Sequence, residues 1–205
     1  MISHSHKFVF LHIPKNAGTS IEHYFLEQKV APTDFNFGVN VHYDNITENI
    51  AKDYFIFAVK RNPWDRFISL WKYWTQLGTR DENKRMPQIA KKIESGELDA
   101  SFPYFCHNLD KFKTLLEQKQ HVHFLNQIDK NNQPAYVNPV WISFENLEKD
   151  FADVCDKIKL PFPKLKKRNS SRPKDNGYRD YYTKDLKKQI EKMYARDIEF
   201  FGYSF

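Results

Sequence analysis

Short apolar segments alternate along the chain with longer segments in which apolar residues recur at helical spacing. Residues 54–59 form an apolar run without a charged residue, which is typical of a strand buried on both faces of a parallel sheet. Three further segments of strand length are predicted at residues 7–13, 121–125 and 140–144.

Helices are predicted in the segments that follow these strands. A helix over residues 19–27 places its apolar residues on one face. Pro63 begins a second helix, over residues 63–77, at the position where a helix tolerates proline best. Two more helices are predicted at residues 147–158 and 184–198. This alternation of strands and helices predicts an α/β fold with a mainly parallel sheet.

The composition is that of a folded globular protein. The chain has 205 residues, which suits one domain over residues 1–205. Its hydrophobic fraction of 40% and its aromatic fraction of 16% exclude an intrinsically disordered chain. Residues 79–100 are polar and charged, so the region of about residues 79–134 is predicted to be a variable helical insertion.

The charge favours anionic partners. The formal net charge is +6, which suits nucleic acid, anionic lipid, polyanionic glycan or a phosphorylated cofactor. No nucleic-acid recognition motif accompanies this charge, so no nucleic-acid partner is expected. Cys106 and Cys155 lack metal-ligand spacing and are predicted to be buried thiols. The apolar runs are too short to cross a bilayer and no signal peptide is evident, so a cytoplasmic location is expected.

Residues 10–20 run from a predicted strand through a turn into a helix start. The free N–H groups and the positive dipole end of a helix start bind anions. Lys15 adds a full charge, Gly18 allows the backbone to approach closely, and Thr19 and Ser20 add hydroxyl donors. A Walker A loop places its lysine after the second glycine, whereas here the lysine precedes the only one. The segment therefore predicts a phosphate-binding loop and disfavours a nucleoside-triphosphate enzyme.

A second segment, residues 57–70, also joins a buried strand to a helix. Arg61 stands at the carboxyl end of the strand, where open α/β sheets bind ligands. Asn62, Arg66 and Ser69 follow at spacings of about one helical turn. An arginine with a nearby hydroxyl suits a terminal phosphate, although an ion pair with Asp65 is an equally good interpretation of this segment alone.

Together the two segments resemble the carbohydrate (type 2) sulfotransferase family. In that family an I-P-K-x-x-G-T-S loop holds the 5′-phosphosulfate of 3′-phosphoadenosine-5′-phosphosulfate (PAPS), and an R-[ND]-P-x-x-R-x-x-S segment holds the 3′-phosphate. The matching residues here are Ile13, Pro14, Lys15, Gly18, Thr19, Ser20, Arg61, Asn62, Pro63, Arg66 and Ser69. The resemblance continues at residues 144–147, 194–197 and 201–203.

The resemblance implies a P-loop-like three-layer fold, with a central sheet flanked by helices, and transfer of a sulfuryl group from PAPS without a metal. The acceptor would be a hydroxyl of a carbohydrate or glycan, bound with the help of residues 79–134, and no oligomeric state is predicted. The implied donor-binding residues are Lys15, Asn16, Ala17, Gly18, Thr19, Ser20, Arg61, Ser69 and Arg168.

The resemblance also implies catalytic roles. Lys15 would stabilise charge on the leaving phosphate. His42 is the predicted general base, because histidine titrates near neutral pH, and Glu22 is its rival. His12 is predicted to be a structural, hydrogen-bonded core histidine. The aromatic row of Trp64, Phe67, Trp71 and Trp74 is predicted to be core, and a lining of the acceptor cleft stays open for part of it.

Two other functions use the same residue types. A P-loop-type nucleotide kinase would need magnesium and a Walker-type lysine, and a non-catalytic binder of anions or polyanions would need neither Lys15 as a catalyst nor a base. Polysaccharides, glycolipids and small metabolites all carry a hydroxyl that a sulfotransferase could use.

Overall fold

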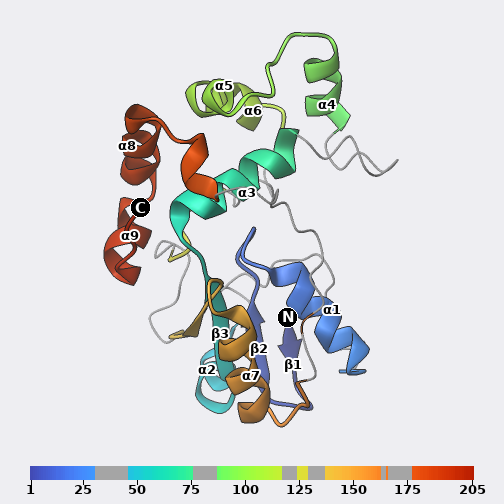
Figure 1. Cartoon of the computed structure of the whole chain (residues 1–205). Helices are drawn as coiled ribbons and strands as arrows, with labels where there is room; N and C mark the ends of the chain where they lie inside the picture. The colour runs from blue at the N-terminus through green and yellow to red at the C-terminus, as the bar shows by residue number, and fades with distance from the viewer. Residues whose placement is uncertain (31–45, 76–86, 117–123, 129–136, 163–164, 166–176) are drawn as a thin grey trace. The chain divides into compact units, whose positions relative to one another are not determined.

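The structure, a computed structural model, describes residues 1–30, 46–75, 87–116, 124–128, 137–162, 165 and 177–205 (Figure 1). The chain divides into two compact units, each built from two stretches of sequence. The sheet unit comprises Met1–Arg61 and Gln127–Ser170, and the helical unit comprises Asn62–Asn126 and Ser171–Phe205. The division therefore falls between Arg61 and Asn62, inside the second motif, while one domain over residues 1–205 stays a prediction.

The sheet unit is built on four strands in the order β1-β2-β3-β4. β2 pairs with β3 in parallel and β3 pairs with β4 in parallel, whereas β1 pairs with β2 in the antiparallel direction. Figure 1 shows β1, β2 and β3 side by side. The strands are β1 (Ile2–Ser3), β2 (Phe8–Leu11), β3 (Phe55–Lys60) and β4 (Val140–Ser143). The mainly parallel sheet and the strands predicted at residues 7–13, 54–59 and 140–144 are confirmed.

Helices cover both faces of this sheet. Successive side chains of a strand point to opposite faces, and the phenylalanines of β2 and β3 all lie on one of them. That face packs against α1 (Gly18–Glu27) and α7 (Leu147–Lys157), and the opposite face packs against α2 (Glu48–Asp53). Burying one such ring contributes about 1.5–3 kcal/mol, so the aromatic face holds α1 firmly on the sheet. The predicted three-layer α/β arrangement is confirmed within this unit.

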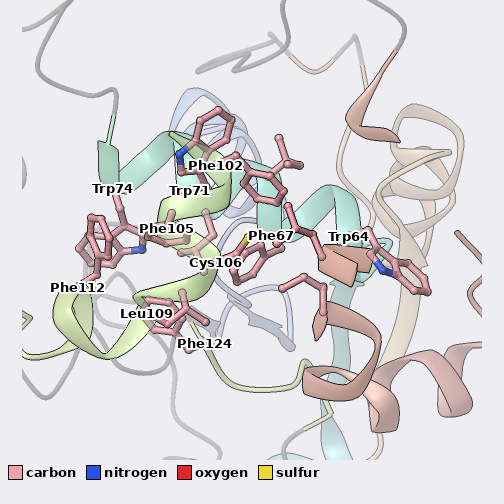
Figure 2. Close-up of a cluster of buried hydrophobic side chains, with 14 of the residues drawn as sticks. Trp64, Phe67, Trp71, Trp74, Phe102, Phe105, Cys106, Leu109, Phe112 and Phe124 are labelled. Carbon is pink, nitrogen blue, oxygen red and sulfur yellow. The ribbon is translucent and has the colours of Figure 1, made fainter. Parts of the chain in front are cut away.

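The helical unit is organised around α3. Its residues Trp64, Phe67, Trp71 and Trp74 recur at helical spacing and are almost fully buried. Figure 2 shows them gathered with Phe102, Phe105, Cys106, Leu109, Phe112 and Phe124. The helices are α3 (Pro63–Thr75), α4 (Pro87–Glu94), α5 (Phe102–His107), α6 (Leu109–Lys113), the 3₁₀ helix η4 (Tyr178–Tyr181), α8 (Lys184–Met193) and α9 (Ala195–Phe201). The aromatic row is therefore core, as predicted.

Two predicted elements differ from the structure. The helix expected over residues 184–198 is two helices, because Tyr194 leaves the helical conformation with φ −113° and ψ 28° while its ring is buried. Of the strand expected over residues 121–125, the structure describes Phe124 and Leu125, and neither is in a strand. Phe124 instead packs into the aromatic core of the helical unit.

The short helices α5 and α6 were not predicted individually. α5 has six residues and α6 has five, which is too few for a helical period to emerge from the sequence. Both lie in the region of residues 79–134, which was predicted to be a helical insertion.

Among the described residues, no helix has the length and apolar character needed to cross a membrane.

Candidate active site

The two motifs start from neighbouring parallel strands. β2 leads into the loop of residues 12–17, and β3 is followed directly by Arg61. The carboxyl ends of parallel strands lie at the same edge of a sheet, so the loop and Arg61 come together there. The Nη1 atom of Arg61 donates a hydrogen bond of 2.7 Å to the carbonyl oxygen of Lys15. The parts of both motifs that belong to the sheet unit therefore form one site.

The loop has the backbone geometry of an anion site. Lys15 and Ala17 adopt left-handed conformations, with φ of 70° and 63°. Each such residue costs about 1–3 kcal/mol and persists only where the surrounding structure imposes it. The first helical hydrogen bonds of α1 run from Ser20 N and Ile21 N to the carbonyl of Ala17, at 2.9 and 3.3 Å. The amides of Gly18 and Thr19 precede them at the positive end of the helix dipole, where an anion is stabilised.

Gly18 is required by a neighbouring histidine. A Cβ atom at Gly18 would lie 2.1 Å from the Nε2 atom of His12, a distance that no pair of non-bonded atoms tolerates. The other ring nitrogen of His12, Nδ1, forms a hydrogen bond of 2.7 Å with Glu22 Oε1. His12 is therefore hydrogen-bonded, as predicted, but 18% of its side chain is exposed, so it is not the core residue that was expected. Glu22, the rival base, is engaged by His12.

Arg61 is fixed by more than one group. Its guanidinium lies 3.9 Å from the ring centroid of Phe144, in the geometry of a cation–π contact, and only 5% of the residue is exposed. A charge in this position raises the electrostatic potential of the loop that it bonds. Its predicted contact with a 3′-phosphate stays a prediction.

A buried glutamine joins the two motifs, and the sequence analysis missed it. Gln127 Oε1 accepts hydrogen bonds from Asn16 Nδ2 at 2.6 Å and from Arg61 N at 2.8 Å, and Gln127 Nε2 donates to Arg61 O at 2.8 Å. Asn16 Nδ2 also donates to Val59 O at 2.6 Å. No motif surrounds Gln127, and it lies in the region predicted to be variable, so nothing in the sequence singles it out.

The rest of the second motif belongs to the helical unit. Arg66, 2% exposed, donates from Nη1 to Leu125 O at 2.9 Å. Asn62 Oδ1 accepts from Trp64 N at 3.1 Å, and Asn62 Nδ2 donates to Ser204 O at 3.0 Å. Ser69 is buried on α3. Within this unit Asn62 directly precedes α3, and Arg66 and Ser69 lie on its first two turns. The donor contact predicted for Ser69 stays a prediction.

A comparison with protein families decides between the functions that the sequence left open. The model of the sulfotransferase family matches residues 1–204, nearly the whole chain. The chain belongs to the sulfotransferase family. No curated protein and no solved structure matches it. The protein is thus an enzyme that transfers a sulfuryl group from a sulfate donor to a hydroxyl-bearing acceptor.

Two predicted site residues of this sulfotransferase, His42 and Arg168, lie outside the described residues. The cysteines are buried and free, as predicted, and burial raises the pKa of the Cys106 thiol to about 12. Burial also raises the pKa of Cys155. Neither thiol is therefore a nucleophile at neutral pH. The described part of the sulfotransferase contains no group of three or more His, Cys, Asp or Glu side chains arranged to hold a metal ion.

Proposed function

We propose that the enzyme uses PAPS as its donor and transfers the sulfuryl group to a hydroxyl of a carbohydrate or glycan. The observation that carries the proposal is the hydrogen bond from Arg61 to the carbonyl of Lys15 at the N-terminus of α1. It brings the side chain of one motif onto the loop of the other. A donor with phosphate groups at both its 5′ and 3′ positions requires two such anion-binding segments.

The charges of the site suit the 5′-phosphosulfate. Lys15 supplies a full positive charge, and the amides of Gly18 and Thr19 supply the helix dipole end. Hydrogen bonds to charged groups each contribute about 1.5–3 kcal/mol, so four or five of them give roughly the 8 kcal/mol that micromolar binding needs after ordering costs. We propose Asn16, Ala17, Thr19 and Ser20 as further members of this loop site, and Arg61, Ser69 and Arg168 for the 3′-phosphate.

The bound donor supplies an activated sulfuryl group, which leaves the bridging oxygen of 3′-phosphoadenosine-5′-phosphate (PAP) and forms a new S–O bond to the acceptor oxygen. Lys15 stabilises the negative charge that develops on that bridging oxygen. His42 takes the proton of the acceptor hydroxyl. A sulfuryl group carries less negative charge than a phosphoryl group, so we propose that the reaction proceeds without a metal.

The first test is calorimetric titration with PAP in the absence of magnesium, with ATP and AMP in parallel. We expect micromolar binding of PAP and weaker binding of AMP, which lacks the 3′-phosphate. Binding that requires magnesium and prefers ATP would contradict the donor assignment and favour a kinase.

An assay of sulfuryl transfer with Lys15→Ala separates the catalytic role of Lys15 from the general effect of a positive charge. Transfer from PAPS to a panel of glycans should fall by about 10²–10³-fold, as for loss of one charge-stabilising group. Lys29→Ala is the matched control, because Lys29 is an exposed lysine of the same unit that also has a positive φ, of 54°. Full activity of Lys15→Ala would overturn the catalytic assignment.

His42→Ala should lower kcat by about 10²–10⁴-fold and leave PAP affinity unchanged.

A further inference from the structure

The side-chain amide of Gln127 lies at the centre of the loop site. Gln127 is 1% exposed, and its three hydrogen bonds reach residues that are 111 and 66 positions away in the sequence. Both partners, Asn16 and Arg61, stand in the motifs that form the site. The hydrogen bonds with these two residues, and not apolar packing in the core of the sheet, explain why a glutamine is buried here.

Gln127 pairs with Arg61 in the manner of a neighbouring strand. β3 ends at Lys60, so Arg61 is the first residue past the ladder. Gln127 Oε1 accepts from Arg61 N at 2.8 Å and Nε2 donates to Arg61 O at 2.8 Å, so one side chain bonds both backbone groups of that residue. A buried backbone group left without a partner is costly, and this pairing removes the cost at the point where the sheet ends.

The same amide oxygen also holds the loop. Oε1 accepts from Asn16 Nδ2 at 2.6 Å, and Asn16 is the residue directly after Lys15. Arg61 in turn donates from Nη1 to Lys15 O. The hydrogen bonds and the chain therefore close a circuit from Gln127 through Arg61, Lys15 and Asn16 back to Gln127. A shift of Gln127 would move the backbone of Lys15 and the guanidinium of Arg61 together.

We propose that Gln127 is a positioning residue of the sulfotransferase, which holds Lys15 and Arg61 at the separation that one donor molecule requires. This inference rests on the proposed function of the loop. Only an uncharged amide of this length meets the requirement, because the side chain must accept two hydrogen bonds and donate one. Glutamate lacks the donor, asparagine is one methylene too short, and leucine has neither donor nor acceptor.

The test compares Gln127→Leu and Gln127→Glu with Gln189→Leu. Gln189 is a matched control, because its Nε2 also donates to a backbone carbonyl, that of Cys106 at 2.7 Å, but within the helical unit. We expect both Gln127 variants to raise the Kd for PAP by about 10- to 100-fold, as for buried groups left unpaired at the site. The control should stay within about twofold of the wild type.

Calorimetry separates positioning from simple loss of fold. A variant that unfolds reversibly raises the apparent Kd only by the reciprocal of its folded fraction, which circular dichroism at the assay temperature measures, whereas displacement of the loop raises the Kd of a variant that is fully folded. A double-mutant cycle with Asn16→Ala adds a second readout, because two members of one circuit give effects that do not add. We expect the loss of affinity in the double variant to be clearly smaller than the product of the two single losses.

The outcomes distinguish the two proposals. An unchanged Kd in Gln127→Leu and Gln127→Glu, or additive effects with Asn16→Ala, would overturn the role of Gln127 while leaving the donor assignment intact. Failure of the wild type to bind PAP would instead overturn the proposed function. Gln127→Glu keeps the size and the accepting oxygen of the side chain, so it serves where Gln127→Leu does not fold.

Discussion

Arg61 and Arg66 stand five residues apart in one motif but belong to different units. Both are buried, and each donates from Nη1 to a backbone carbonyl distant in the sequence. Arg61 bonds Lys15 and lies against the ring of Phe144, whereas Arg66 bonds Leu125 and lies 5.6 Å from the ring centroid of Tyr194. The same residue type thus supports the loop of Lys15 in one unit and the packing around α3 in the other.

The comparison shows that a motif is not a structural unit. In the sheet unit, the buried polar groups near Arg61 are bonded to one another and to the loop. In the helical unit, the residues after Asn62 accompany an aromatic core. Effects on donor binding and effects on stability should therefore separate between Arg61 and Arg66.

The largest expected difference is between Arg61→Ala and Arg66→Ala. Loss of Arg61 removes the bond to Lys15 O and the charge beside it, so we expect the Kd for PAP to rise by about 100-fold. Loss of Arg66 leaves the carbonyl of Leu125 unpaired, so the free energy of unfolding should fall by about 1–3 kcal/mol. Calorimetry and urea unfolding measure the two quantities. Equal changes in both quantities for both variants would remove the distinction between the units.

A smaller difference is expected between two glycines. Gly18→Ala in the sheet unit places a Cβ against His12, so we expect a loss of about 1–3 kcal/mol in the free energy of unfolding and weaker PAP binding. Gly96→Ala in the helical unit meets no atom within 4 Å, and only its φ of 78° opposes the change. Its cost should be about 1 kcal/mol with PAP affinity unchanged.

The histidine provides the check on this interpretation. His12→Ala removes the ring that a Cβ at Gly18 would meet, so Gly18→Ala should cost less in the His12→Ala background than in the wild type. The measurement is urea unfolding of the two single variants and the double variant. An equal cost in both backgrounds would mean that the glycine is needed for another reason.

The smallest expected difference is between two buried tyrosines. In the sheet unit Tyr24 donates from its hydroxyl to the carbonyl of Pro161, whereas the hydroxyl of Tyr194 has no partner within the described part of the helical unit. Tyr24→Phe should lower the free energy of unfolding by about 1 kcal/mol, and Tyr194→Phe should leave it unchanged or raise it by up to about 1 kcal/mol.

The pH dependence distinguishes Tyr194 further. Burial raises its pKa to about 12, from an ordinary value near 10. The folded state holds the proton of the Tyr194 hydroxyl more tightly than the unfolded state does. The contribution of this group to the free energy of unfolding is therefore fully present below about pH 10 and is lost as the pH rises toward 12. Urea unfolding at pH 8 and pH 11 should show a smaller alkaline loss in Tyr194→Phe than in the wild type. An identical loss would contradict this assignment.

Much of the fold could be predicted from local sequence. The strands β2, β3 and β4 are apolar runs bounded by polar residues or proline, and α1 and α7 carry apolar residues on one face. The break at Tyr194 could not be predicted, because each half of residues 184–198 has good helical character by itself. Tyr194 stands at the break with its ring buried, and its burial depends on the surrounding core.

The sequence by itself determined the strand and the helix start that flank the loop of Lys15 to Ser20, because hydrophobic periodicity and turn residues act over a few neighbouring positions. The family followed from the resemblance of the two motifs and from the match over residues 1–204. Tertiary structure decided which polar groups meet at that loop. Gln127 joins Asn16 across 111 residues, and His12 requires a glycine at position 18. Such contacts depend on strand register and on the close approach of segments that local patterns do not bring together.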